Sequence, residues 1–316
     1  MTVSVVIPCY NAASYIEACL DSIVGQTYAD TEIICVNDGS GDNTEQAIQD
    51  YQLKSSCNLR LVNQANGGGG SARNSGFRQA KGEYIQFLDA DDQLFPDKLR
   101  HQTDLIKAAG KKPDFIAADF ILESKQQKSV IRSHEQRPFH ALLGKNLGIT
   151  SANLWRRKVL ENVNGFDERL KSSQEYDLMF RILQRGGSVL FDPVPLTLKC
   201  ERNASSISKM NKGDNRVRFI HLQLRVLDYL RKSDLLDEGL ESYFYHKLFY
   251  EIRLLHEFDP VRSFHMHREL IPSSFRLEGS AEISARYITI YKLFGYRMTQ
   301  KIWNAYNSIH AQDNQE

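Results

Sequence analysis

Short β-branched runs alternate with helical patterns through the first 120 residues, and this alternation limits the possible folds more than any other feature of the sequence. Residues 3–7 and 33–36 flank a segment whose apolar residues recur at helical spacing and which Gly25 is placed to end. Further strand-like runs lie at residues 59–62, 84–88 and 115–118. Strands that alternate with helices form a mostly parallel sheet with helices on both faces. The sequence therefore predicts an α/β fold.

Polar loops follow three of these runs. Residues 37–42, 66–76 and 89–92 are rich in Gly, Asp and Asn, and each follows an apolar, strand-like segment. In open α/β sheets, ligands bind in the crevice beyond the carboxyl ends of the strands. We therefore expect the three loops to face one crevice.

The third loop places Asp89, Asp91 and Asp92 within four positions. Carboxylates this close repel one another unless positive charge lies among them, and hard oxygen ligands suit Mg²⁺ or Mn²⁺. Asp89 and Asp91 are the candidate metal ligands, and Asp92 could cap the helix that follows. The alternative is a polar loop that holds no ion.

The composition limits which partners the protein is expected to bind and in which cellular compartment we expect it. Forty basic and 39 acidic residues leave a formal charge of +1, which provides no overall attraction for nucleic acid or anionic membranes. Five cysteines without a CxxC pair favour reduced thiols in a cytoplasmic protein. The N-terminal residues resemble a first strand rather than a signal peptide, and no apolar run is long enough to span a bilayer.

The pattern changes beyond about residue 212, where helical spacing replaces strand-like runs. We expect an α/β domain at residues 1–210 and a helical region at residues 211–316, with a surface loop at residues 123–140. The final apolar stripe, at residues 283–306, has basic residues nearby. It is typical of a packing helix, and the alternative is a basic, aromatic helix on a membrane surface.

Five ordered motifs lie at residues 4–12, 36–40, 66–68, 71–76 and 87–92. Together they resemble the signatures of family 2 glycosyltransferases, and the resemblance extends over about residues 3–210. The resemblance implies a GT-A fold, with a donor half at about residues 1–120 and an acceptor half at about residues 121–210. It also implies inverting transfer from a nucleotide-diphosphate sugar, with a UDP-sugar as the expected donor.

The same resemblance assigns residues to the donor. Asp38 falls on the position that reads the base, where a carboxylate can accept the N–H of a uracil, although an Asp before Gly39 also suits an Asx-turn. Asp91 would hold Mn²⁺ or Mg²⁺, and Asp89 would lie on the ribose side or in the metal's water shell. The implied donor-binding residues are Pro8, Tyr10, Asn11, Asp38, Gly67, Arg73, Asp89 and Arg202.

Two positions depart from the family pattern. The catalytic base commonly lies in Glu-Asp-x-Asp, and here residues 174–177 read Gln-Glu-Tyr-Asp, so that Glu175 takes the base position and Asp177 is the alternative. Glu adds one methylene to the expected Asp, enough to move the carboxylate by about an ångström. Asn203 takes the place of a His after Arg202, which removes one potential metal ligand. Trp155 could stack on a sugar, but a lone Trp is more often a core residue.

The resemblance further implies a glycan or lipid-linked acceptor in bacterial surface polysaccharide or lipopolysaccharide synthesis. Peripheral contact with the inner face of a membrane through the C-terminal helices is compatible with such an acceptor. The alternatives are a sugar-phosphate nucleotidyltransferase and a nucleotide-sugar-binding protein without catalysis. The nucleotidyltransferase requires a glycine-rich loop with Arg after the first strand, where this sequence has Pro8-Cys9-Tyr10-Asn11.

Overall fold

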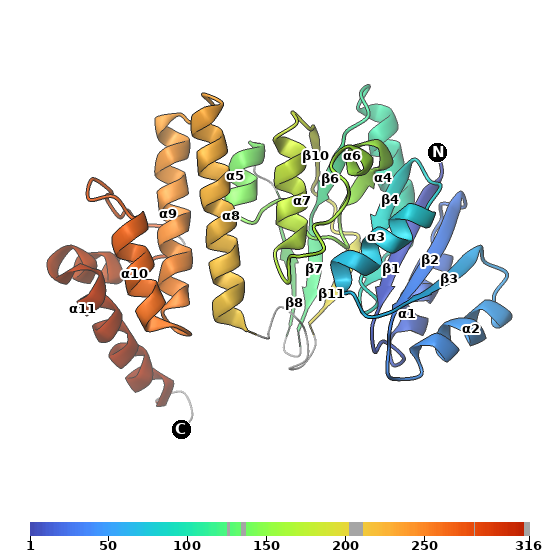
Figure 1. The fold of residues 1–316 in the computed structure, drawn as a ribbon, viewed down its shortest axis with the longest axis horizontal. Coiled ribbons are helices and arrows are strands. Elements are labelled where there is room, and N and C mark those ends of the chain that lie inside the picture. Colours follow the sequence, from blue (N-terminus) through green and yellow to red (C-terminus); the bar gives the residue numbers. More distant parts are fainter. Residues whose placement is uncertain (125–126, 134–136, 202–210, 281, 313–316) are drawn as a thin grey trace. The chain divides into compact units, whose positions relative to one another are not determined.

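The computed structural model describes residues 1–124, 127–133, 137–201, 211–280 and 282–312 (Figure 1). The chain divides into two compact units, Met1–Ser206 and Ile207–Glu316. The first unit contains a central sheet with helices around it (Figure 1). In the described segments of the second unit, the regular elements are helices, with one isolated β-bridge between Ser280 and Ile283. The α/β architecture with C-terminal helices is the one predicted from the sequence.

The central sheet has seven strands in the order β10-β6-β9-β4-β1-β2-β3. Strands β1 to β4 are mutually parallel where they pair, and β10 is parallel to β6. Strand β9 is antiparallel to both of its neighbours, β4 and β6. The sheet is therefore mostly parallel, as predicted. Its strands are β1 (Val3–Cys9), β2 (Thr31–Asp38), β3 (Leu59–Gln64), β4 (Tyr84–Phe87), β6 (Phe115–Ala118), β9 (Leu154–Arg156) and β10 (Val189–Asp192).

The core of the first unit lies on these strands and on the helices packed against them. Every residue of β4 is buried, and β1 and β2 are buried over almost their full length, as expected for strands covered on both faces. Trp155 is fully buried and stacks on Phe115, so its role is in the core. The helices are α1 (Ile16–Val24), α2 (Thr44–Lys54), α3 (Gly69–Gln79), α4 (Lys98–Ala108), α5 (Pro138–Leu143), α6 (Arg157–Asn162) and α7 (Gln174–Leu183).

A second, four-stranded sheet follows the order β5-β11-β7-β8, from β5 (Gln93–Leu94), β11 (Thr197–Cys200), β7 (Phe120–Glu123) and β8 (Lys128–Ile131). Strand β8 pairs antiparallel with β7, so the expectation of a loop throughout residues 123–140 is wrong. The polar sequence is explained by position, because β8 is the last strand of the sheet and most of its side chains are exposed.

The second unit consists of α8 (Lys212–Lys232), α9 (Glu238–Leu255), α10 (Pro260–Leu270) and α11 (Ala285–Gln312). Aromatic rings from α11 and from the segment before it surround Phe249, among them Phe275, Tyr287, Tyr291 and Tyr296. Helix α11 is interrupted at Gly295, which has φ 67° and ψ 174°. None of the described helices is both long enough and apolar enough to cross a membrane. The five cysteines are free thiols.

Candidate donor and metal site

The loops after β1 and β2 meet at the carboxyl ends of these strands. The backbone N–H of Asn11, after β1, donates to Ser40 Oγ (3.1 Å), and the N–H of Gly41 donates to Asn11 Oδ1 (2.8 Å). These bonds hold the loop after β1 against the loop after β2, as the parallel sheet predicts. Asn11 adopts φ 49°, a left-handed conformation that Asn tolerates better than most residues. Tyr10 is more than half exposed, and Pro8 pairs within β1 opposite Val36.

Asp38, at the end of β2, is hydrogen-bonded to the glycine-rich segment after β3. Its Oδ1 accepts the N–H of Gly67 and the side-chain amide of Gln64, and its Oδ2 accepts the N–H of Gly68, all within 2.7–2.8 Å. Asp38 is 3% exposed. The side chain thus shapes the loop that precedes α3.

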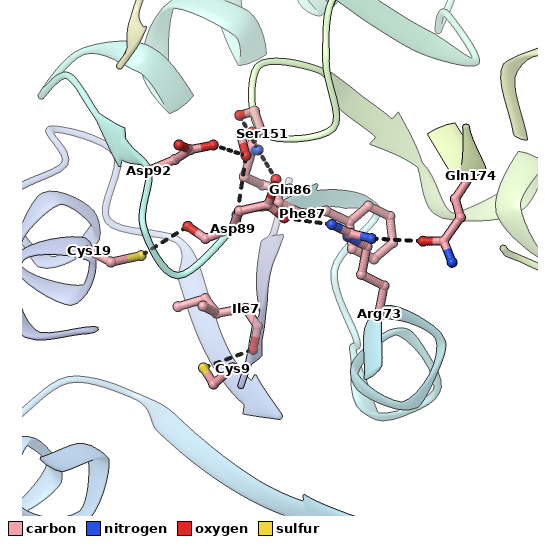
Figure 2. A network of polar contacts seen from close by, with 10 residues as sticks. All are labelled: Ile7, Cys9, Cys19, Arg73, Gln86, Phe87, Asp89, Asp92, Ser151 and Gln174. Carbon is pink, nitrogen blue, oxygen red and sulfur yellow. Dashed lines mark hydrogen bonds and ion pairs between the residues drawn. The ribbon is translucent and has the colours of Figure 1, made fainter. Parts of the chain in front are cut away.

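Arg73 of α3 connects this segment to the acidic loop after β4 (Figure 2). Its guanidinium donates to Asp89 Oδ1 at 2.6 Å and to Gln174 Oε1 at 3.3 Å. It also lies over the Phe166 ring, 5.4 Å from the centroid. Burial alone would raise the pKa of Asp89, but the charge and hydrogen bond of Arg73, with a contribution from Lys199, lower it overall. Asp89 is therefore ionised and forms an ion pair with the Arg73 guanidinium.

The acidic loop brings three carboxylates together. Oxygen atoms of Asp89, Asp91 and Asp92 lie within 4.8 Å of one another. Burial, together with the charges of Asp89 and Asp91, raises the pKa of Asp92 to about 7. A hard divalent cation fits this donor set, because carboxylate oxygens are its preferred ligands and its charge would favour their ionised forms. The cluster is therefore a candidate site for a divalent cation such as Mg²⁺ or Mn²⁺.

The expectation that Asp92 caps a helix is wrong. Its Oδ2 accepts a hydrogen bond from Ser151 Oγ at 2.6 Å, and its Oδ1 accepts one from the Cys200 N–H at 3.2 Å. Helix α4 begins at Lys98 after Asp97, without a side-chain cap. Ser151 Oγ in turn accepts the N–H of Asp89, as Figure 2 shows. Asp92 therefore joins the acidic loop to the end of β11 and to the segment before β9.

The two carboxylates in the first turn of α7 have different surroundings. Asp177 is buried and accepts a bond from Arg181 Nε at 2.7 Å. Glu175 is half-buried, and within the described parts of the chain its carboxylate takes part in no hydrogen bond or ion pair. Gln174 packs against Gly70, where an added Cβ would come within 2.8 Å of the Gln174 amide nitrogen. The first turn of α7 therefore adjoins the first turn of α3.

The site contains residues that sequence reasoning did not single out. Ser151 and Gln174 contact the acidic loop or Arg73, and Phe166 lies under the guanidinium. Of these three residues, only Gln174 has a sequence signal, which is its position beside Glu175. Arg202, which was expected at the diphosphate, lies outside the described residues.

The fold and these loops define a GT-A type protein with a central sheet, flanking helices and an acidic loop at the sheet's carboxyl edge. The chain resembles the first 349 residues of *S. aureus* TarS in complex with UDP-GlcNAc, with a TM-score of 0.62, 18% identity, and coverage of 96% of this chain and 92% of that chain. It also resembles the mannosyltransferase PcManGT of *Pyrobaculum calidifontis* in complex with GDP-Man and Mn²⁺, with a TM-score of 0.56, 17% identity, and coverage of 96% and 83%.

The glycosyl transferase family 2 model matches residues 4–168, which is more than half of the chain. The chain belongs to this family. An uncharacterized glycosyltransferase of *Rickettsia bellii* is 34% identical over 227 residues, 67% of this chain. The match covers 32% of that relative, so the chain spans about a third of its length.

Proposed function

We propose that the protein is a metal-dependent, inverting glycosyltransferase that takes a sugar from a nucleotide-diphosphate donor, with a UDP-sugar as the expected donor. The observation that carries the proposal is the cluster of Asp89, Asp91 and Asp92, joined through Arg73 to the glycine-rich segment. Membership of family 2 and the nucleotide sugars in the TarS and PcManGT complexes support it.

In this proposal the loops after β1, β2, β3 and β4 bind the nucleotide. Asp38, Asn11 and Gly67 form the base and ribose side, with Pro8 and the exposed Tyr10 beside them. Arg73 and Asp89 face the ribose and diphosphate. Asp91, with Asp89 near it, would hold Mn²⁺ or Mg²⁺, which supplies Lewis-acid neutralisation of the leaving diphosphate. The hydrogen bonds of Asp38 to Gly67 and Gly68 support a preformed loop, because they fix the backbone before a ligand arrives. Arg202 remains the proposed additional contact with the diphosphate.

Glu175 is the proposed general base. It would accept the proton of an acceptor hydroxyl as the oxygen bonds to the anomeric carbon and the bond from that carbon to the diphosphate breaks, which inverts the configuration. The absence of a partner for the Glu175 carboxylate among the described residues favours Glu175 over Asp177, since Arg181 already binds the latter. The longer Glu side chain also reaches further from the helix than an Asp would.

The proposed acceptor is a glycan or a lipid-linked sugar in the synthesis of a bacterial surface polysaccharide. A protein with this role would act in the cytoplasm, at the inner face of the membrane when its acceptor is lipid-linked. A sugar-phosphate nucleotidyltransferase is disfavoured, because the loop after β1 carries Tyr10 and Asn11 in place of a glycine-rich, arginine-containing segment.

A donor panel tests the proposal. The full chain is incubated with UDP-, GDP- and dTDP-sugars in Mn²⁺, and release of the nucleoside diphosphate is measured with and without EDTA. We expect release from one class of donor, and its loss in EDTA. Release from none of the donors, together with no binding of any of the nucleotides, would overturn the proposal.

A second comparison tests the base. Glu175→Gln is expected to slow sugar transfer by about 10²–10⁴-fold with little change in nucleotide affinity, because the amide cannot accept the proton. Glu17→Gln, on the exposed face of α1, is the matched control. Equal rates for Glu175→Gln and the wild type would rule out Glu175 as the base.

A further inference from the structure

Helices α10 and α11 of the second unit form an open pocket of about 380 Å³. Its floor is aromatic, because the rings of His267 and Tyr296 stack 4.0 Å apart. Its rim is cationic, since Arg268 and Arg297 are exposed and the Arg297 guanidinium lies 5.7 Å from the Phe264 ring centroid. The lining residues are Phe264, His265, His267, Arg268, Tyr296 and Arg297.

Large apolar side chains are exposed on α11 next to the residues of this pocket. Leu293 is 70% exposed, Phe294 56% and Met298 47%. They surround the interruption at Gly295 and lie within three residues of Tyr296, which is buried. The predicted apolar stripe of this helix is therefore divided: Tyr287 packs in the core, whereas Phe294 and Met298 do not.

The charge of α11 has one sign. Between Ala285 and Gln312 the sequence contains Arg286, Lys292, Arg297 and Lys301 and no acidic residue, although the whole chain carries a formal charge of only +1. Lys292, Arg297 and Lys301 are exposed. The acidic side chain nearest in sequence to the pocket residues is Glu269, and it lies 3.3 Å from His265.

We propose that this face, formed by the pocket with Leu293, Phe294 and Met298, binds the surface of a bilayer containing anionic phospholipid. Exposed apolar side chains flanked by basic ones are the combination that binds at a lipid interface: the apolar groups enter the headgroup region while the cations attract anionic lipid. The pocket offers two guanidinium groups to a lipid phosphate. A second copy of the chain fits less well, because the same cationic face would oppose itself.

Vesicle flotation of the full chain tests the proposal. We expect the wild type to float with vesicles of phosphatidylcholine and phosphatidylglycerol. With vesicles of phosphatidylcholine alone, we expect the protein to remain in the bottom fraction. Leu293→Ser/Phe294→Ser/Met298→Ser is expected to lose binding by more than tenfold. Arg268→Gln/Arg297→Gln is expected to lose about fivefold for each charge removed. Binding should also weaken as salt is added.

Two matched control variants test whether loss of vesicle binding is specific to the proposed face. Leu53→Ser removes an 87% exposed leucine from the first unit, and Lys111→Gln removes an exposed charge there, so both should float like the wild type. Circular dichroism must show that all variants are folded. The proposal is overturned if the wild type does not float with anionic vesicles, if the triple Ser variant floats as well as the wild type, or if the variants change only the oligomeric state in light scattering. The inference is independent of the proposed function, because the residues proposed to bind the nucleotide all belong to the first unit.

Discussion

Asp92 illustrates how a buried carboxylate can organise a site by its hydrogen bonds. It accepts bonds from Ser151 and from the Cys200 N–H, which belong to segments far from it in the sequence. Because Ser151 also accepts the Asp89 N–H, one hydroxyl fixes both ends of the acidic loop. Asp92 is therefore proposed as a positioning residue for Asp89 and Asp91.

Ser151→Ala tests this positioning role. The substitution leaves one oxygen of the buried Asp92 without its hydroxyl donor, which should lower the free energy of unfolding by about 1–3 kcal/mol. It should also weaken Mn²⁺ binding, because the acidic loop loses its support. Urea unfolding and Mn²⁺ titration measure the two effects. The exposed Ser274→Ala is the control, and unchanged Mn²⁺ affinity in folded Ser151→Ala would show that the hydroxyl does not position the loop.

Lys98 is a buried lysine whose amino group has no hydrogen-bond partner in the described structure. Burial lowers its pKa from 10.5 to about 7, partly opposed by the charge of Asp192. The unfolded chain takes up this proton below pH 10.5 and the folded chain only near pH 7, so this group lowers stability progressively as pH falls from 10.5 to 7.

Lys98→Met should therefore raise the free energy of unfolding at pH 7, by on the order of 1–4 kcal/mol, and reduce its dependence on pH between 7 and 10. Asp192 keeps its bonds to His101 and Gln102 in this variant. Urea unfolding at several pH values measures the change, with the exposed Lys111→Met as control. Lower stability of Lys98→Met than of the wild type at pH 7 would contradict this account.

Individual site residues could be predicted from the sequence where the type of side chain indicates its chemistry. The crowding of Asp89, Asp91 and Asp92 indicated a cluster before any contact was known, and the structure brings their oxygens together. Ser151 could not be found in this way, since it lies 59 positions from Asp92 and belongs to no charged pattern. The hydrogen bonds that Gly67 and Gly68 donate to Asp38 could not be predicted either, because these residues also lie far from Asp38 in the sequence.

At the scale of elements, α3 lies unusually close to the sheet. A Cβ at Gly76 would come within 2.4 Å of Val6 Cγ1 and 3.1 Å of Val36 Cγ2. This glycine allows the helix that carries Arg73 to rest on β1 and β2, next to the ends of the strands. The position of the guanidinium therefore depends on a residue one turn further along the helix.

Gly76→Ala should shift α3 away from the sheet. We expect overpacking to lower the free energy of unfolding by about 1–3 kcal/mol and nucleotide affinity to fall, because Arg73 moves with the helix. Thermal unfolding and nucleotide titration measure these effects. Gly279→Ala is the control, since a Cβ there would meet Ile288 at an ordinary 3.9 Å. Equal stability of both variants would contradict the proposed close packing.

Elements with a strong local pattern were predictable, and those defined by distant partners were not. The buried runs that form β1, β2 and β4 are β-branched or aromatic and follow the expected order. Strand β8 has a polar sequence and exists because β7 pairs with it. In α11 the apolar spacing continues through Gly295, so the sequence did not reveal that its middle would be exposed.

At the scale of the whole molecule, the proposed functions are divided between the two units. The candidate donor and metal site belongs to Met1–Ser206, and the proposed lipid-binding face belongs to Ile207–Glu316. The fold class followed from the alternation of strands and helices, because local pattern and overall architecture agree there. Acceptor choice has no comparable signal, since it depends on side-chain shape rather than on a repeated pattern.

The most direct test of the central claim is a calorimetric titration of UDP into the full chain, with Mn²⁺ and with EDTA, for the wild type, Asp91→Asn and the exposed Asp104→Asn. A metal shared by the acidic loop and the diphosphate should make UDP bind at least tenfold more tightly in Mn²⁺ for the wild type and Asp104→Asn, from about 1.4 kcal/mol of coupling. Asp91→Asn should lose this difference. Equal enhancement by Mn²⁺ in Asp91→Asn and the wild type, or UDP affinity in the wild type that does not depend on Mn²⁺, would contradict the account.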